Sequence, residues 1–119
     1  MADNRRIGVT IITGDAVAYE SVAFTNASAV GLTAALVEPT RVHTGANTLP
    51  RTTAFITFET GGVNARYRYD GTAPTAGEGH LAADGKEITL MGVRNLNRLR
   101  FILVSAGSAT VRVTYHGSA

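Results

Sequence analysis

The chain has 119 residues, no cysteine, a formal net charge of +2 and a charged fraction of only 17%. This length predicts one domain with a single core, and the absence of cysteine excludes disulfides and thiolate chemistry. The charged fraction lies below the roughly 25% of average proteins, which favours a surface partly covered by copies of the chain or by a partner. A soluble monomer with a threonine-coated exterior is the alternative.

Arginine dominates the cationic residues: ten of the eleven are arginine, and Lys86 is the exception. Arginine is enriched in interfaces, although a GC-rich genome would produce the same excess. No apolar run approaches the roughly 20 residues needed to span a bilayer. The short apolar run after Arg5 and Arg6 lacks a signal-peptide cleavage site, so we expect synthesis and assembly in the cytoplasm.

Short strands separated by turn residues are predicted from the beginning of the chain. A flexible N-terminal arm carries Arg5 and Arg6. Strands are predicted after it at residues 7–13, 19–25, 32–37 and 41–44. Residues 27–37 could instead form a short helix by composition, although Gly31 and the β-branched residues weaken that alternative.

Two β-hairpins are predicted in the second half of the chain. The β-rich runs 53–60 and 63–69 flank a Gly-Gly pair, which can supply the positive φ angles of a tight turn. The runs 99–104 and 109–115 flank a Gly-Ser pair in the same way. The first of these last two runs is apolar on both faces, which predicts a central or covered strand.

Between the hairpins lie a long loop at residues 71–83 and a predicted strand at residues 87–91. A loop of this length is either functional or a plain crossover between sheets. Eight or nine short strands in one domain of residues 1–119 predict an antiparallel β-sandwich, for which a jelly roll is one candidate topology. Its predicted core residues are Phe55 or Phe58, Tyr67, Leu90, Phe101, Val111 and Val113.

No catalytic, metal-binding or cofactor-binding motif is found. The histidines His43, His80 and His116 lack metal-site spacing, and neither a nucleophile elbow nor a phosphate loop occurs. Glu59 and Asp70 would lie near each other if the first hairpin forms, but a turn-capping role for Asp70 is favoured over a carboxyl pair. We therefore predict no enzymatic activity, no metal and no cofactor.

The run Arg66, Tyr67, Arg68, Tyr69 alternates basic and aromatic residues. Alternation along a strand places the tyrosines and the arginines on opposite faces. They cannot then form one stacking platform unless the strand is twisted or lies at an edge, and the net charge is low, so the pattern argues against nucleic-acid binding.

Four sequence segments support a resemblance to a known family that covers roughly the last two thirds of the chain: AFITFET, ARYRYDGTAPTAGEGH, ADGKEITL and LRFILVSAGSATVRVTY. In these segments the chain resembles small β-sandwich structural proteins from the virions of tailed phages and prophages. The resemblance implies a non-enzymatic virion component that is assembled in the host cytoplasm.

Within that setting, the preferred role is a capsid decoration or cement protein that binds the major capsid lattice, often as a trimer. Its expected partner-binding residues are Arg5, Arg6, Arg66, Arg68 and His80. The alternative is a tail or fibre-tip module that binds host-surface glycan, with candidate residues Tyr67, Tyr69, His80 and Tyr115.

Overall fold

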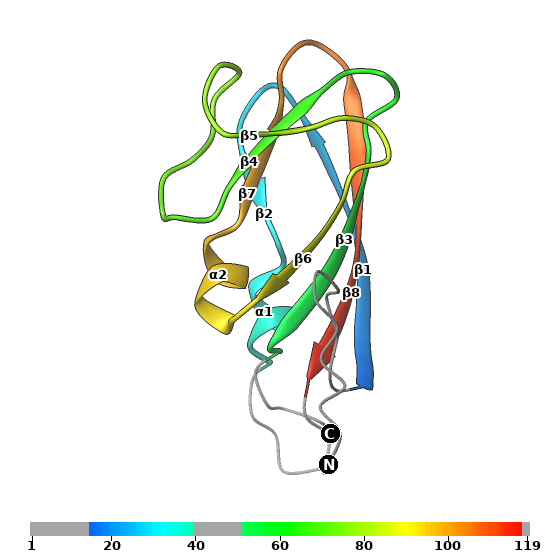
Figure 1. Ribbon diagram of the computed structural model, residues 1–119, viewed down its shortest axis with the longest axis vertical. Helices are drawn as coiled ribbons and strands as arrows, with labels where there is room; N and C mark the ends of the chain where they lie inside the picture. The colour runs from blue at the N-terminus through cyan, green and yellow to red at the C-terminus, as the bar shows by residue number, and fades with distance from the viewer. Residues whose placement is uncertain (1–14, 40–50, 118–119) are drawn as a thin grey trace, which may run out of the picture.

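The computed structural model describes residues 15–39 and 51–117, and these form two four-stranded antiparallel sheets that pack face to face (Figure 1). The first sheet has the order β1-β8-β3-β6 and the second has the order β2-β7-β4-β5. The strands are β1 (Asp15–Thr25), β2 (Val30–Gly31), β3 (Thr53–Glu59), β4 (Ala65–Arg68), β5 (His80–Ala82), β6 (Glu87–Met91), β7 (Arg100–Leu103) and β8 (Ser108–Gly117). The predicted all-β sandwich is therefore confirmed.

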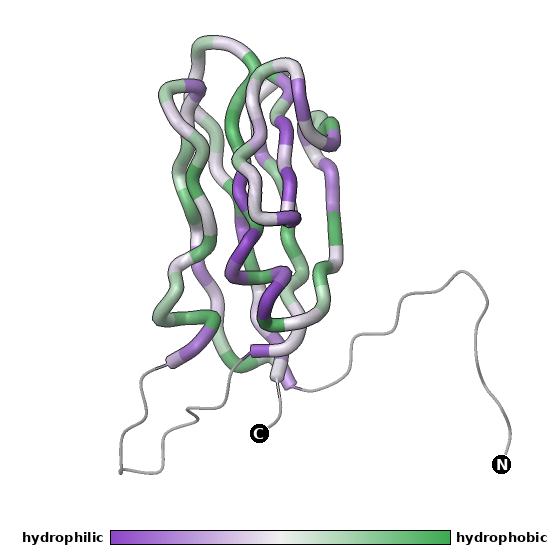
Figure 2. The backbone as a smooth tube through the Cα atoms, turned by 90° about the vertical axis from the view of Figure 1, so that its left-hand side faces the viewer, coloured by the Kyte–Doolittle hydropathy of each residue, from purple (hydrophilic) through white to green (hydrophobic). Residues whose placement is uncertain are grey.

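The core lies between the sheets, because each long strand turns one face inward. In β8, the odd-numbered residues from 109 to 115 are buried, whereas their neighbours are exposed or half-buried. Figure 2 shows hydrophobic residues alternating with polar ones along the strands. Five predicted core residues are buried: Phe58, Leu90, Phe101, Val111 and Val113.

Of the alternatives Phe55 and Phe58 it is Phe58 that is buried, and the predicted core residue Tyr67 is only half-buried. Phe55 alternates with the fully buried Ala54 and Ile56, so it lies on the outer face of the first sheet. Tyr67, in the interior strand β4, packs against the core but stays partly exposed.

The first predicted hairpin is wrong in its pairing, although both runs are strands. β3 pairs with β6 and β8 in the first sheet, whereas β4 pairs with β5 and β7 in the second. Gly61 and Gly62 do have positive φ angles, of 66° and 94°. The turn they form carries the chain from one sheet to the other.

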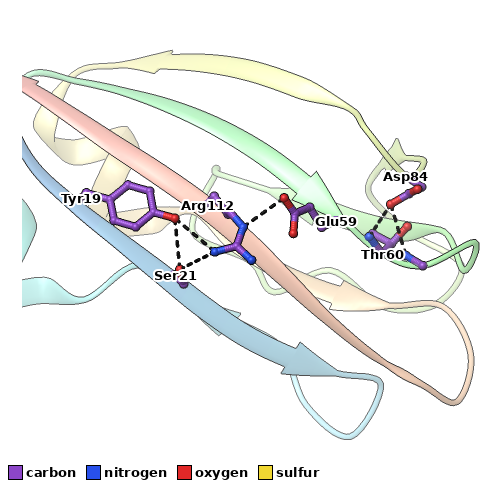
Figure 3. Close-up of polar contacts among 7 residues, drawn as sticks. Tyr19, Ser21, Glu59, Thr60, Asp84 and Arg112 are labelled. Carbon is purple, nitrogen blue, oxygen red and sulfur yellow. Dashed lines mark hydrogen bonds and ion pairs between the residues drawn. The ribbon is translucent and has the colours of Figure 1, made fainter.

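A carboxylate holds this crossover in place. Asp84 Oδ1 accepts hydrogen bonds from the backbone amides of Thr60, at 2.8 Å, and Gly61, at 3.2 Å (Figure 3). Thr60 is almost fully buried, so its amide would otherwise lack a partner away from water. The bonds join the end of β3 to the turn before β6.

The second predicted hairpin is wrong for the same reason. β7 lies in the second sheet, between β2 and β4, and β8 lies in the first sheet, between β1 and β3. The run at residues 99–104, apolar on both faces, was predicted to be a central or covered strand, and the central position of β7 confirms this.

Two short helices occur among the described residues. Where residues 32–37 were expected to form a strand, the chain forms α1 (Ala34–Val37). The alternative helix at residues 27–37 is confirmed only over this last turn, because Val30–Gly31 form β2. Thr33 O accepts the amides of Leu36 and Val37 in α1, and Ala and Leu favour a helical turn. The second helix, α2 (Val93–Arg98), connects β6 to β7 and buries Leu96.

Other predicted segments agree with the structure or lie outside it. The strand at residues 19–25 is part of the longer β1, and the strand at residues 87–91 coincides with β6. The predicted strands at 7–13 and 41–44, the arm with Arg5 and Arg6, and His43 lie outside the described residues. In the described part of the chain, no helix has the length and apolar character to span a membrane.

Candidate functional site

A ladder of stacked rings runs from the core to the surface at the open edge of the second sheet. Phe58, fully buried in β3, stacks on Tyr67 of β4, with centroids 5.6 Å apart and planes at 30°. Tyr67 contacts His80 of β5 at 5.2 Å, and His80 stacks on Tyr69 at 6.1 Å and 26°. Because each ring packs on the next, the two outer rings, His80 and Tyr69, are held in place.

Strand pairing explains this ladder. Tyr67 and His80 are directly opposite each other in the β4–β5 pair, so their side chains lie on the same face. Tyr69 follows two residues after Tyr67 and returns to that face. Burial raises the pKa of the Tyr67 hydroxyl above its usual value of 10.0, so this ring stays neutral at physiological pH.

An ion pair lies beside the outer rings. Arg68 donates two hydrogen bonds to the carboxylate of Asp70, from Nε at 3.1 Å and from Nη2 at 2.6 Å. This fork, together with the amide of Thr72, lowers the pKa of Asp70 to about 2. Asp70 is therefore ionised, and the two charges cancel.

The loop between β4 and β5 is tied to the sheet by Arg66. Its Nη1 donates to Gly79 O at 2.9 Å and its Nε donates to Ala76 O at 3.3 Å. Gly79 has a φ of 131°, and a Cβ there would lie 3.2 Å from the Pro74 Cβ. The expected partner-binding residue Arg66 thus has a structural role within its own loop.

Arg68, Tyr69, Asp70 and His80 together line an open pocket of about 230 Å³. The lining residues are two with aromatic rings, Tyr69 and His80, and the two partners of the Arg68–Asp70 ion pair. The structure brings together Arg68 and His80, which were expected to bind a partner, with Tyr69, which was expected to contact glycan. Arg5 and Arg6 lie outside the described residues.

One expected glycan residue, Tyr115, is placed elsewhere. It is fully buried, and its hydroxyl donates a hydrogen bond to the carboxylate of Glu20. Glu20 also accepts the hydroxyl of Thr33 at 2.6 Å and its amide at 3.1 Å. Burial, and then the Glu20 carboxylate, raise the pKa of the Tyr115 hydroxyl well above its ordinary range. This cluster joins β1, β8 and the segment before α1, and Tyr115 cannot contact a surface ligand.

The second surface feature is the outer face of the first sheet, where a polar network lies across three strands. Arg112 of β8 donates to Glu59 of β3 at 3.0 Å, and to Ser21 and Tyr19 of β1 at 3.1 and 3.2 Å (Figure 3). A hydrogen bond between the Tyr19 and Ser21 hydroxyls, and then the one from Arg112, lower the pKa of the exposed Tyr19 hydroxyl. The network joins side chains of β1, β8 and β3 on this face.

The rest of this outer face is rich in threonine and apolar side chains. The register places Tyr19, Thr114, Phe55 and Thr89 in one row across the four strands. The same alternation assigns to this face the buried Thr53 and also Thr57, Thr110, Met91 and the exposed Glu87. Tyr19 and Met91 are more than half exposed. We call this set, with the Arg112 network, the threonine face.

Glu59 and Asp70 are not brought together. Glu59 ends β3 in the first sheet and pairs with Arg112, whereas Asp70 follows β4 in the second sheet and pairs with Arg68. Their expected proximity depended on the hairpin that does not form. Within the described ranges, no group of three histidine or acidic side chains is placed to hold a metal ion.

Sequence reasoning did not identify the Arg68–Asp70 fork or the threonine face. The fork had a signal, because residues two apart on an extended chain lie on the same side. The threonine face had none, because it depends on which strands become neighbours in the first sheet.

Comparison of the chain with protein-family models, curated proteins and solved structures finds no match.

Proposed function

We propose that this protein is a structural component of a phage virion, a decoration protein that binds the major capsid lattice through the threonine face. The resemblance of its last two thirds to small virion sandwich proteins supplies the setting. The observation that supports attachment is the threonine face itself, a four-stranded surface that carries the Arg112–Glu59 pair and, on β6, the exposed Glu87 among its threonine and apolar side chains.

The chemistry of this face suits protein contact. Threonine and the half-buried Phe55 lose little solvation when they are covered, whereas free charges would lose much. Arg112 and Glu59 already neutralise each other, so no isolated charge of that pair is buried on docking. Many copies on a regular lattice would multiply a weak single contact, as multivalent binding requires.

The test is binding to particles made without this protein. Wild-type protein should co-sediment with such particles. Thr114→Arg, at the centre of the threonine face, should lower the bound fraction at least tenfold with an unchanged melting temperature. Thr72→Arg, an exposed threonine in the loop of the second sheet, is the matched control and should bind normally. Failure of the wild type to bind, or normal binding by Thr114→Arg, would refute the proposal.

The expected N-terminal arm is tested in the same assay. Deletion of residues 1–6 removes Arg5 and Arg6 and should reduce occupancy if they dock on a neighbouring subunit. Unchanged occupancy with an intact fold would remove the arm from the mechanism. Size-exclusion chromatography with light scattering of the free protein tests the expected trimer.

A tail or fibre-tip module that binds host-surface glycan is the second candidate, and the pocket of Arg68, Tyr69, Asp70 and His80 favours it. The two candidates place the protein at different positions on the particle. Imaging of labelled protein on virions separates them: label over the head supports decoration, and label at the tail tip supports the glycan module.

A further inference from the structure

We infer that the pocket lined by Arg68, Tyr69, Asp70 and His80 is a binding site for a neutral sugar ring. This pocket would be the glycan-binding site of the tail or fibre-tip module proposed as the second candidate function. Only the source of the glycan rests on the virion proposal. Binding itself is a property of the isolated chain and is measured without particles.

The aromatic rings of Tyr69 and His80 can stack on one side of a sugar ring. Tyr69 is 37% exposed and stacks on the exposed His80. An aromatic face carries negative potential, so it attracts the weakly positive C–H groups on one side of a pyranose ring. The ladder through Tyr67 to the core holds both rings before a ligand arrives, which reduces the ordering cost of binding.

The Arg68–Asp70 ion pair can form hydrogen bonds with the sugar hydroxyls. Of the five N–H groups of Arg68, two are used by Asp70, and the others have no partner among the described residues. Asp70 keeps acceptor capacity on Oδ2, which takes only the Arg68 bond. Donor and acceptor thus stand side by side, as adjacent sugar hydroxyls require, since each hydroxyl both donates and accepts.

The charge of the pocket argues for a neutral ligand. Arg68 already faces an ionised carboxylate, because the pKa of Asp70 is lowered to about 2. A phosphate or carboxylate ligand would have to compete with Asp70 for the guanidinium and would be repelled by it. A cationic ligand would meet the corresponding repulsion from Arg68.

The size of the pocket limits the ligand. Its volume of about 230 Å³ is below the roughly 300–1,000 Å³ of sites for drug-sized molecules. It therefore accommodates one ring of a longer chain, and the rest of the glycan remains in solvent. The loop between β4 and β5, which carries Asp70, lies at the left of Figure 1, away from β1 and β8 at the right. Docking through the threonine face would leave the pocket accessible.

The experiment is an NMR titration of the isotope-labelled full chain with methyl glycosides of glucose, galactose, mannose and N-acetylglucosamine. At least one glycoside should shift the amides of residues 68–70 and 80, with a millimolar dissociation constant typical of a small ligand in an open site. Adenosine monophosphate, an anionic compound with an aromatic ring, is the comparison probe and should bind more weakly.

Three variants assign the site. Tyr69→Ala should raise the dissociation constant about tenfold, and Tyr69→Phe should restore most of the affinity because it keeps the ring. Tyr19→Ala, an exposed tyrosine on the threonine face, is the matched control and should bind like wild type. No shift with any glycoside, shifts confined to other residues, unchanged binding by Tyr69→Ala or tighter binding of adenosine monophosphate would each overturn the inference. Tyr69→Ala should occupy capsids normally, so this result is separate from the decoration proposal.

Discussion

Removal of the Phe101 ring should be among the most destabilising single changes to this fold. Phe101 is fully buried in β7, and its ring contacts Phe24 of β1 at 4.9 Å and Phe58 of β3 at 6.1 Å, both edge to face. The three rings therefore join the two sheets at the centre of the sandwich. Truncation to alanine leaves a cavity whose walls belong to different sheets, which limits how far it can collapse.

Buried Phe→Ala changes cost about 3–5 kcal/mol, and lost edge-to-face contacts add to transfer and cavity terms. We expect Phe101→Ala to lower the free energy of unfolding by about 4 kcal/mol. With a urea m-value near 2 kcal/mol/M, the denaturation midpoint should fall by about 2 M. Total stabilities lie at about 5–15 kcal/mol, so the variant should still fold unless the parent is at the lower end.

Two further variants complete the measurement. Phe101→Leu keeps much of the volume and should cost about 1–1.5 kcal/mol, so it remains informative if the alanine variant does not fold. Leu81→Ala, half exposed on the edge strand β5, is the surface control and should cost under about 1 kcal/mol. A loss below about 1 kcal/mol for Phe101→Ala would contradict the packing described above.

Three other predictions concern polar contacts. Tyr115→Phe keeps the buried ring but removes the donor to Glu20, so the free energy of unfolding should fall by about 1–3 kcal/mol; urea titration giving no loss would refute this. Asp84→Ala deprives the two crossover amides of their acceptor and should cost about 1–3 kcal/mol, whereas Asp84→Asn, which keeps an acceptor, should cost less. The pKa of Asp70, followed by NMR, should be about 2 and should rise toward 3.8 in Arg68→Gln. Because the folded pKa is the lower one, this pair stabilises the fold above about pH 4, and the contribution is lost as the pH falls through about 2. An unchanged Asp70 pKa in Arg68→Gln would exclude the fork as its cause.

The strands were predictable because their signal is local. β6 coincides with its predicted residues, and β8 extends a predicted strand, since alternating β-branched and polar residues suit a sheet with one buried face. The pairing of strands was not predictable in the same way. Gly61 and Gly62 define a tight turn, but a turn inside one sheet and a crossing between two sheets both bury the apolar faces of β3 and β4. Long-range packing selects the crossing.

The short helix α2 had little local signal. It begins after Gly92, whose φ is 99°, and no side chain caps its first turn. Its position follows from the buried Leu96 and from the need to cross from β6 to β7. The strand β5 was missed for a similar reason: only residues 80–82 of a long glycine-containing loop pair with β4, and their pairing depends on anchors such as Arg66.

The candidate pocket could be predicted only in part from the sequence, and the reason is topological. The spacing of Arg68 and Asp70, and the alternation of Tyr67 and Tyr69, are local features. The position of His80 between the two tyrosines depends on β5 returning beside β4. The anchor of the ladder, Phe58, belongs to the other sheet. The pocket is therefore a surface extension of the core, and the order of its outer rings depends on the same inter-sheet packing that stabilises the fold.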